Sequence, residues 1–120
     1  VEETQEGRGC LILERYPEGD LSQHLPFPKL EQVWDLFIQM LLALLHLHEQ
    51  QQIVHGDIKP ANILLEESSG GILRIRLGDF GSSHSVGLMG EGGTPYYLAP
   101  ELWQDGPTST PASDIWALGC

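Results

Sequence analysis

The chain has 120 residues, enough for one small domain or for part of a larger one. It carries 17 Asp and Glu against 6 Lys and Arg, which gives a formal net charge of −11 at pH 7. This balance argues against nucleic acid or an anionic membrane as a partner, since both are bound through clustered Lys and Arg. Nucleotide binding stays open, because it needs only local cations, a metal ion or backbone donors.

The cysteines and the apolar runs of the sequence indicate the cellular compartment and whether a membrane partner is expected. Cys10 and Cys120 lie near opposite ends of the chain and form neither a disulfide framework nor a zinc-ligand pattern. We therefore expect a reducing, intracellular setting, in the cytoplasm or also in the nucleus. The longest apolar run, MLLALLHLH at 40–48, is too short to span a bilayer, and no signal peptide pattern opens the chain. We expect no membrane partner.

The first half of the chain predicts a strand and two helices. GCLILERY at 9–16 is an apolar run followed by the turn signal PEGD, which predicts a strand. DLSQHL at 20–25 predicts a short helix capped by Asp20. Residues 30–48 give the strongest helix pattern, with apolar residues at 30, 33, 34, 37, 41, 44 and 45. Further apolar residues widen this stripe almost all round, so we expect burial on most sides.

The second half predicts a hairpin, a long loop and the start of another helix. NILLEESSGGILRIRL at 62–77 contains two apolar runs separated by the turn SSGG. Residues 79–100 are rich in Gly, Ser and Pro, and long loops inside compact domains are usually functional. SDIWALG at 113–119 has a helix-like pattern.

The loop HGDIKPAN at 55–62 carries side chains suited to phosphoryl transfer. Asp57 can orient a hydroxyl group, Lys59 supplies a point charge to phosphate, and Asn62 offers a carbonyl oxygen to a hard cation. Taken alone, these residues fit a surface turn equally well. Asp79 in GDFG is a second loop carboxylate, which by itself also fits a turn after a strand.

Two further motifs, GTPYYLAPE at 93–101 and SDIWALG, complete an ordered series with HGDIKPAN and DFG. In this order the four motifs resemble a eukaryotic protein kinase domain of the serine/threonine type, over essentially the whole chain. The resemblance implies an α+β, protein-kinase-like fold that is partial, with a mainly helical C-lobe, a hairpin at the catalytic loop and a hinge strand. It assigns 1–19 to the end of the N-lobe and the hinge, and 20–120 to part of the C-lobe.

The resemblance also implies ATP-dependent phosphoryl transfer to Ser or Thr of a protein substrate, with Mg²⁺ as cofactor. Asp57, Lys59 and Thr94 match the family's catalytic residues, and Asn62 and Asp79 match its two Mg²⁺ ligands. General-base positioning of the kind implied for Asp57 contributes roughly 10² to 10⁴ in rate.

Five residues match positions that contact ATP in the family: Leu13, Glu14, Tyr16, Asp20 and Leu64. Leu13 falls at the gatekeeper position, and the backbones of Glu14 and Tyr16 would bind adenine. Asp20 would lie near the ribose, and Leu64 below the adenine ring.

Three other residues match structural positions. His55 and Phe80 match a stacked pair that couples the catalytic loop to the activation segment. Asp114 matches a helix Asp that caps the backbone of the catalytic loop.

The sequence departs from the family pattern in two places. Gly56 stands where many kinases have an Arg that pairs with a phosphorylated activation-loop residue, so we expect activity without that phosphorylation. The family's glycine-rich loop and strand Lys have no counterpart, since the only lysines are Lys29 and Lys59. We therefore expect the 120-residue chain alone not to transfer phosphate at a useful rate.

Two other function classes remain open. HGD with an Asn five residues later also resembles the loop of aminoglycoside and choline phosphotransferases, which share the kinase-like fold. GTPYYLAPE and SDIWALG favour a protein substrate over a small molecule, although a likeness of fold says little about substrate. The second alternative is a non-catalytic, pseudokinase-like interaction fragment, against which the intact catalytic-loop residues argue.

Overall fold

The computed structural model describes residues 2–3, 9–10, 13–27, 29–68, 72–90, 92–104 and 108–120. Within these ranges the chain forms two α-helices and three two-stranded antiparallel sheets. Short 3₁₀ helices connect these elements: η1 (Leu21–Gln23), η3 (Pro60–Asn62), η4 (Phe80–Ser82), η5 (Pro95–Tyr97) and η6 (Pro100–Trp103).

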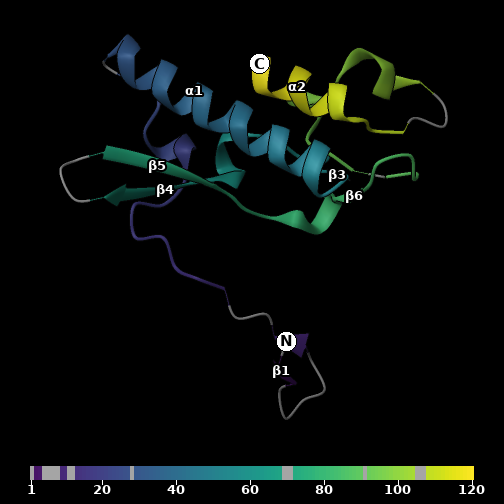
Figure 1. The fold of residues 1–120 in the computed structure, drawn as a ribbon, viewed down its shortest axis with the longest axis horizontal. Coiled ribbons are helices and arrows are strands. Elements are labelled where there is room, and N and C mark those ends of the chain that lie inside the picture. Colours follow the sequence, from purple (N-terminus) through teal and green to yellow (C-terminus); the bar gives the residue numbers. More distant parts are fainter. Residues whose placement is uncertain are drawn as a thin grey trace.

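The core lies between one long helix and one hairpin. Helix α1 (Leu30–Leu45) crosses the hairpin of β4 (Ile63–Ser68) and β5 (Ile72–Leu77), as Figure 1 shows. The two strands run antiparallel, and Ile63 lies opposite Leu77. The buried core residues are Leu36, Met40, Leu44, Ile58, Ile63, Leu65 and Ile75. Because these side chains come from α1, the hairpin and the loop before it, the core fixes that loop against both elements.

A glutamine of α1 attaches the helix to the outer edge of β5. Gln39 Nε2 donates to the carbonyl oxygen of Leu73 at 3.0 Å, and its Oε1 accepts from the backbone amide of Ile75 at 3.1 Å. In an antiparallel pair, alternate residues turn their backbone groups away from the neighbouring strand. Gln39 therefore satisfies groups that an edge strand would otherwise leave to solvent.

The two other sheets are short. Strands β1 (Glu2–Glu3) and β2 (Gly9–Cys10) pair with each other. Strand β3 (Ile53–Val54), just before the HGD loop, pairs with β6 (His84–Ser85), just after DFG. The β3–β6 pair therefore places the two motif-bearing loops side by side.

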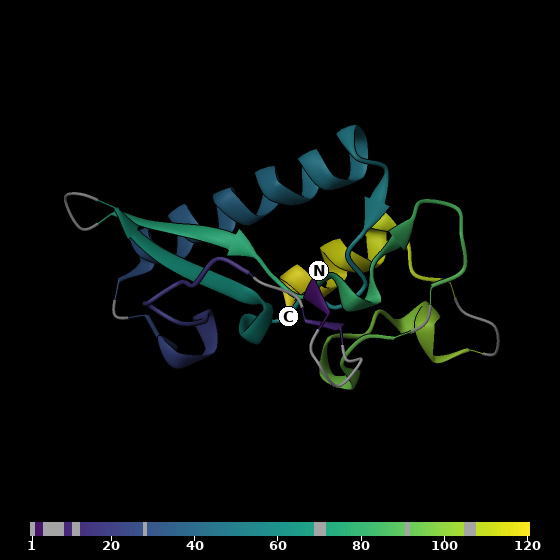
Figure 2. The same cartoon turned by 90° about the horizontal axis from the view of Figure 1, so that it is seen from below.

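Helix α2 (Pro111–Gly119) lies beside the C-terminal part of α1 and next to β3 (Figures 1 and 2). Its N-terminus is a capping box in which Thr110 and Ser113 exchange hydrogen bonds, and Pro111 occupies the first turn. This cap fixes where α2 begins, and so fixes the position of Asp114 in its first turn.

Several sequence predictions are confirmed. The hairpin strands span 63–68 and 72–77, with most of the predicted turn SSGG outside the described residues. SDIWALG is helical, and Asp20 caps η1 by accepting from the backbone amide of Ser22. The predicted strand at 9–16 is wrong in its second half, because residues 13–16 form no strand. Residues 11 and 12 lie outside the described residues.

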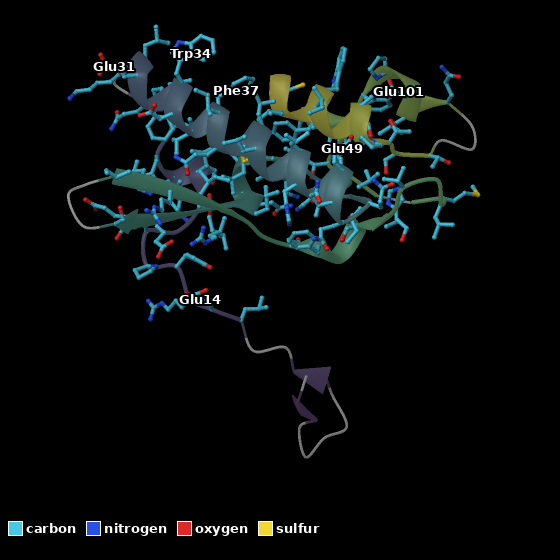
Figure 3. The ribbon with its side chains drawn as sticks, viewed as in Figure 1. Glu14, Glu31, Trp34, Phe37, Glu49 and Glu101 are labelled. Atoms are coloured by element: carbon cyan, nitrogen blue, oxygen red, sulfur yellow. The ribbon has the colours of Figure 1, made fainter. Side chains whose placement is uncertain are left out.

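The predicted buried face of the long helix is wrong for most of its members, although Leu44 is buried as expected. Leu36, Met40 and Leu44 are the buried residues of α1, whereas several members of the predicted stripe are exposed in this chain: Leu30, Val33, Trp34, Leu41 and Leu45 (Figure 3 labels Trp34). The prediction failed because apolar residues cover α1 almost all round, so periodicity alone could not select a face. Burial on most sides is likewise not observed within this chain.

The helix predicted at 30–48 is confirmed, and it is longer than the apolar run at 40–48 from which we expected no membrane span. Helix α1 continues through the π-helical turn η2 (His46–Gln50), and the 21 residues Leu30–Gln50 are long and apolar enough to cross a membrane by length and composition alone. The argument from length therefore does not hold for the whole helix. Its C-terminal end carries the buried residues Leu47 and His48, and the core of a soluble protein can contain such a helix.

Candidate active site

Three residues form a closed set of hydrogen bonds at the catalytic loop. Lys59 Nζ donates to Asp57 Oδ2 at 2.7 Å and to Thr94 Oγ1 at 2.8 Å. Thr94 Oγ1 in turn donates to Asp57 Oδ1 at 2.7 Å, across 37 positions of sequence. The structure thus brings together the three residues that the sequence predicted as catalytic.

Asn62 closes the loop back onto Asp57. Its Nδ2 donates to the backbone oxygen of Asp57 at 2.8 Å and to Asp57 Oδ2 at 3.1 Å. The 3₁₀ helix η3 makes this possible, because Pro60 begins it and turns the chain so that Asn62 faces the loop. Since Nδ2 makes both contacts, the carbonyl Oδ1 is the atom of Asn62 left to meet a cation.

These contacts keep the Asp57 carboxyl group ionised. Burial raises the pKa of Asp57, but hydrogen bonds from Lys59, Thr94 and Asn62 and the charge of Lys59 outweigh it, so the pKa lies below its ordinary value. The side chain is 12% exposed, and the ion pair with Lys59 is therefore partly shielded from water. A group in this state can accept a hydrogen bond from a hydroxyl at neutral pH.

His55 couples the loop to the DFG segment. Its Nε2 lies 3.0 Å from the carbonyl oxygen of Gly78, and its Nδ1 accepts from the backbone amide of Asp57 at 3.3 Å. Because a carbonyl can only accept and an amide can only donate, the neutral ring carries its proton on Nε2. The ring stacks on Phe80 with centroids 4.9 Å apart, which confirms the predicted pair. With both nitrogens engaged, His55 is a structural residue.

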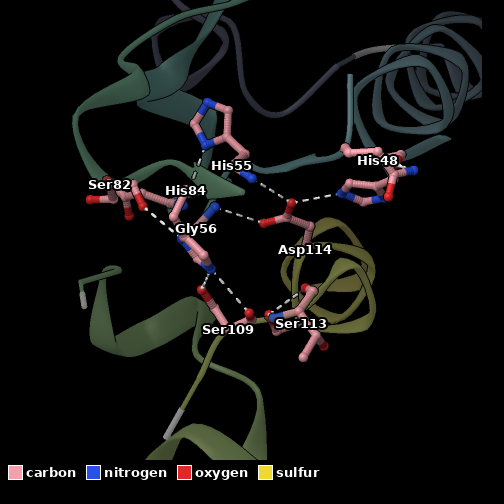
Figure 4. A network of polar contacts seen from close by, with 11 residues as sticks. His48, His55, Gly56, Ser82, His84, Ser109, Ser113 and Asp114 are labelled. Carbon is pink, nitrogen blue, oxygen red and sulfur yellow. Dashed lines mark hydrogen bonds and ion pairs between the residues drawn. The ribbon is translucent and has the colours of Figure 1, made fainter. Parts of the chain in front are cut away.

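Asp114 caps the backbone of the catalytic loop, as predicted. It is 2% exposed, and its carboxylate accepts from the backbone amides of His55 at 2.8 Å and Gly56 at 2.9 Å (Figure 4). His48 Nε2 lies 2.8 Å from the same carboxylate. The first turn of α2 therefore fixes the residues immediately before Asp57.

Gly56 adopts a conformation that suits glycine. Its φ is +80°, and a Cβ at this position would lie 2.8 Å from the carbonyl oxygen of Ser82. The backbone of the catalytic loop thus approaches the activation segment more closely than a side chain would allow. An Arg at this position, as in many kinases, would require the two segments to separate.

The two predicted Mg²⁺ ligands lie on neighbouring backbone segments. The amide of Gly78 donates to the backbone oxygen of Asn62 at 2.8 Å, and Asp79 follows directly. Asp79 has a left-handed φ of +55°, and its Oδ1 accepts from the amide of Gly81 at 3.2 Å. The described side chains of Asn62 and Asp79 share no hydrogen bond. Their oxygen atoms are nevertheless the hard donors that Mg²⁺ prefers, so the donor set fits the ion.

The predicted nucleotide residues fall into two groups. Asp20 and Leu64 lie together, because they form an antiparallel bridge along β4. Leu13, Glu14 and Tyr16 form the second group, and Leu13 is 73% exposed. The Tyr16 hydroxyl donates to Glu14 Oε2 at 2.8 Å (Figure 3 labels Glu14). This hydrogen bond raises the pKa of Tyr16. No contact joins the segment 13–16 to Asp57 within the described residues.

Sequence reasoning missed two histidines of the site. His48 is 7% exposed and pairs with Asp114. His84 was not singled out, yet its ring joins β6 to Ser109. The one available signal was a histidine within the apolar pattern of a helix, and nothing in the sequence shows which distant residue such a histidine meets.

The sequence profile described as "Protein kinase domain" matches residues 2–120. The chain belongs to the protein kinase family. Its curated relatives include the serine/threonine-protein kinase RUNKEL of Arabidopsis thaliana, which is 41% identical over 92% of this chain. The serine/threonine-protein kinase nekl-2 of Caenorhabditis elegans is 42% identical over 92% of the chain, and Nek1 of Mus musculus is 38% identical over 99%.

The chain spans only part of these kinases. Its match covers 8% of RUNKEL, 30% of nekl-2 and 10% of Nek1. The structure is accordingly a fragment of a protein kinase domain with helices and small antiparallel sheets, which confirms the coarse fold prediction. The curated relatives named here are all serine/threonine kinases, which agrees with the type predicted from DIKPAN.

Proposed function

We propose that the full-length protein carrying this kinase domain transfers the γ-phosphoryl group of ATP to Ser or Thr of protein substrates. One observation carries the proposal: Lys59 bridges the carboxylate of Asp57 and the hydroxyl of Thr94 at 2.7 and 2.8 Å. This bridge assembles a carboxylate, a cation and the peptide-side loop at one point. Phosphoryl transfer depends mainly on such positioning and electrostatic stabilisation.

The hydrogen-bond acceptor positions of Asp57 that are still unused indicate where the substrate hydroxyl binds. Oδ2 already accepts from Lys59 and Asn62, whereas Oδ1 accepts only from Thr94. A carboxylate oxygen has two lone pairs, so Oδ1 retains one for a substrate hydroxyl. In the reaction the hydroxyl oxygen forms a bond to the γ-phosphorus, the bond to the β–γ bridging oxygen breaks, and ADP leaves. The hydroxyl proton passes to Oδ1 of Asp57.

We propose Asn62 Oδ1 and the Asp79 carboxylate as the ligands of Mg²⁺. When bound, the ion neutralises negative charge on the phosphate oxygens. Lys59 lies within reach of the same loop and contributes its positive charge to the transferred group. Leu64 and Asp20, joined by their backbone bridge, are proposed to line the nucleotide side, with Leu13, Glu14 and Tyr16 as the hinge contacts.

The experiment is a radiolabel transfer assay on the full-length protein with ATP, Mg²⁺ and a degenerate peptide library. We expect label on Ser and Thr, and loss of at least about 10²-fold in kcat for Asp57→Asn, the scale of general-base positioning. Asp79→Asn should raise the Mg²⁺ concentration needed for half-maximal rate. Glu49→Gln, an exposed change on η2, serves as the matched control.

The two alternatives give different results in the same assay. A small-molecule phosphotransferase would label an aminoglycoside or choline and leave peptides unlabelled. A non-catalytic interaction fragment would bind nucleotide or a protein without turnover, and Asp57→Asn would change nothing. Either result would contradict the proposed function.

We further propose that activity does not require phosphorylation of the activation loop. The support is Gly56, whose close approach to Ser82 leaves no room for the Arg that would bind a phosphate. The test replaces Ser82, Ser83 and Ser85 together by Ala in the full-length protein. We expect the rate to stay within about threefold of wild type, the range of a minor structural change. Loss of activity would contradict the hypothesis.

The domain boundaries and the setting of the protein are proposals too. We propose that 1–19 form the end of the N-lobe and the hinge and that 20–120 form part of the C-lobe. We also propose a reducing, intracellular location, for which Cys120 offers support as an exposed free thiol. A fluorescent fusion of the full-length protein would report its compartment.

A further inference from the structure

His84 makes polar contacts with two carbonyl groups that the catalytic site does not use. Its Nε2 lies 3.1 Å from the backbone oxygen of Ser109 and 3.2 Å from Ser109 Oγ, and its Nδ1 lies 3.4 Å from the backbone oxygen of Ser82 (Figure 4). A carbonyl oxygen can only accept, so Nε2 carries a proton in the shorter contact. Ser109 is 7% exposed, and the hydrogen bond is therefore largely sheltered from water.

The ring of His84 also supports the backbone of the activation segment. A Cβ on Gly90 would lie 2.1 Å from both Cε1 and Nδ1 of His84, so the Gly90 backbone rests directly on the imidazole. A Cβ on Gly92 would lie 2.8 Å from Ser82 Oγ. These contacts place Gly90 and Gly92, shortly before Thr94, against residues that follow DFG.

The backbone around His84 is fixed from the opposite side. His84 pairs with Val54 in the β3–β6 sheet, and the amide of Val86 donates to the backbone oxygen of Gln52 at 2.8 Å. Ser109 directly precedes Thr110, the N-cap of α2. One side chain of β6 therefore contacts the nearby Gly90 and also the residue before α2, which lies 25 positions further along the chain.

We propose that His84 is a positioning residue for the phosphoryl-transfer site. Its Nε2–H bond to Ser109 and its ring beneath Gly90 hold the activation segment so that Thr94 reaches Asp57 and Lys59. This arrangement uses a side chain and a backbone carbonyl, without a phosphate or an arginine. The activity measurements that test this inference rest on the proposed function, whereas the hydrogen-exchange measurement rests on the geometry alone.

Two conservative variants separate the hydrogen bond from general packing. In His84→Gln the amide nitrogen can occupy the place of Nε2, whereas in His84→Asn it reaches only the place of Nδ1. In the full-length protein we expect Gln to keep kcat/KM for peptide within about twofold of wild type, and Asn to lower it about 3- to 10-fold, the value of one hydrogen bond. KM for ATP should stay unchanged in both variants. Equal behaviour of Gln and Asn would overturn the role of Nε2.

A double-mutant cycle tests the contact with Gly90. Gly90→Ala should lower peptide kcat/KM in the wild-type background, because its Cβ meets the ring. In the His84→Ala background the ring is gone, and Gly90→Ala should cause no further loss. Gly87→Ala is the control, since a Cβ there meets nothing within 4 Å. Additive effects of the two changes would show that the ring does not support Gly90.

Hydrogen exchange of residues 84–94 supplies a measurement that does not need activity. We expect faster exchange there in His84→Asn and His84→Ala, and wild-type exchange in His84→Gln and in the exposed control Glu49→Gln. If the wild-type protein transfers no phosphate, the proposed function fails while this comparison still decides on His84. Unchanged exchange in His84→Ala would overturn the inference.

Discussion

The carboxylate of Asp114 accepts a hydrogen bond from the backbone amide of His55 at 2.8 Å, although 59 positions separate the two residues. The same carboxylate accepts from Gly56 and lies 2.8 Å from His48 Nε2. Three donors from the catalytic loop and the end of the long helix thus meet one buried group on α2. The geometry of the loop that carries Asp57 depends on this contact as well as on its own sequence.

Asp114→Asn should destabilise the full-length protein. The amide has one oxygen in place of two, so at least one donor loses its acceptor. We expect a loss of about 1.5–3 kcal/mol in the free energy of unfolding, the range for hydrogen bonds to a charged group. Denaturant unfolding measures it. Glu49→Gln, an exposed change on η2, should stay within about 0.5 kcal/mol of wild type. Equal stability of the two variants would contradict the prediction.

Gly56→Ala and Gly87→Ala separate backbone strain from steric contact. Both glycines have positive φ, +80° and +85°, but only at Gly56 would a Cβ meet another atom, the Ser82 oxygen at 2.8 Å. We expect Gly87→Ala to cost about 1 kcal/mol, the strain of a left-handed conformation. Gly56→Ala should cost clearly more and also lower activity. Thermal unfolding of both variants provides the comparison, and a larger effect at Gly87 would refute it.

Thr94→Val should shift the acid limb of the pH–rate profile. Burial raises the pKa of Asp57, but hydrogen bonds from Lys59, Thr94 and Asn62 lower it by more, so the net pKa is below its ordinary value. Removing the Thr94 hydroxyl should therefore raise this pKa. The native pKa lies below the unfolded one, so the stabilisation is complete above the unfolded pKa and is lost as pH falls through the native value.

The pH dependence of kcat/KM in the full-length protein measures this shift. We expect Thr94→Val to lose activity at a higher pH than wild type. Thr94→Ser keeps a hydroxyl and should keep the wild-type acid limb. An acid limb that moved equally in both variants would mean that the hydroxyl does not act on Asp57.

Gln39→Met should weaken the attachment of the long helix to the hairpin. Methionine has a similar length but leaves the Leu73 oxygen and the Ile75 amide without the contacts that Gln39 makes. We expect a loss of about 1–3 kcal/mol, the cost of unsatisfied polar groups. Gln50→Met, an exposed change on η2, is the control. A loss no larger than that of the control would show that solvent replaces Gln39.

The ordered motifs were enough to predict the family, which the profile match confirms, and to name candidate site residues. Ordered motifs at 55–62, 79–81, 93–101 and 113–119 are local strings, and each stays readable without knowledge of the fold. The hairpin and the cap at Asp20 were predictable for the same reason, because turn and capping signals act within a few residues. The motif match also placed Thr94 with Asp57, which the structure confirms.

Long-range packing selected the buried face of α1 and the residues that surround the motifs. Apolar residues lie almost all round α1, so the choice of Leu36, Met40 and Leu44 depended on where the hairpin packs. The contacts of His48 with Asp114 and of His84 with Ser109 join residues that no local pattern relates. The pairing of β3 with β6 and the packing of α2 bring distant parts of the chain together. The partner of each histidine is therefore set by packing in three dimensions.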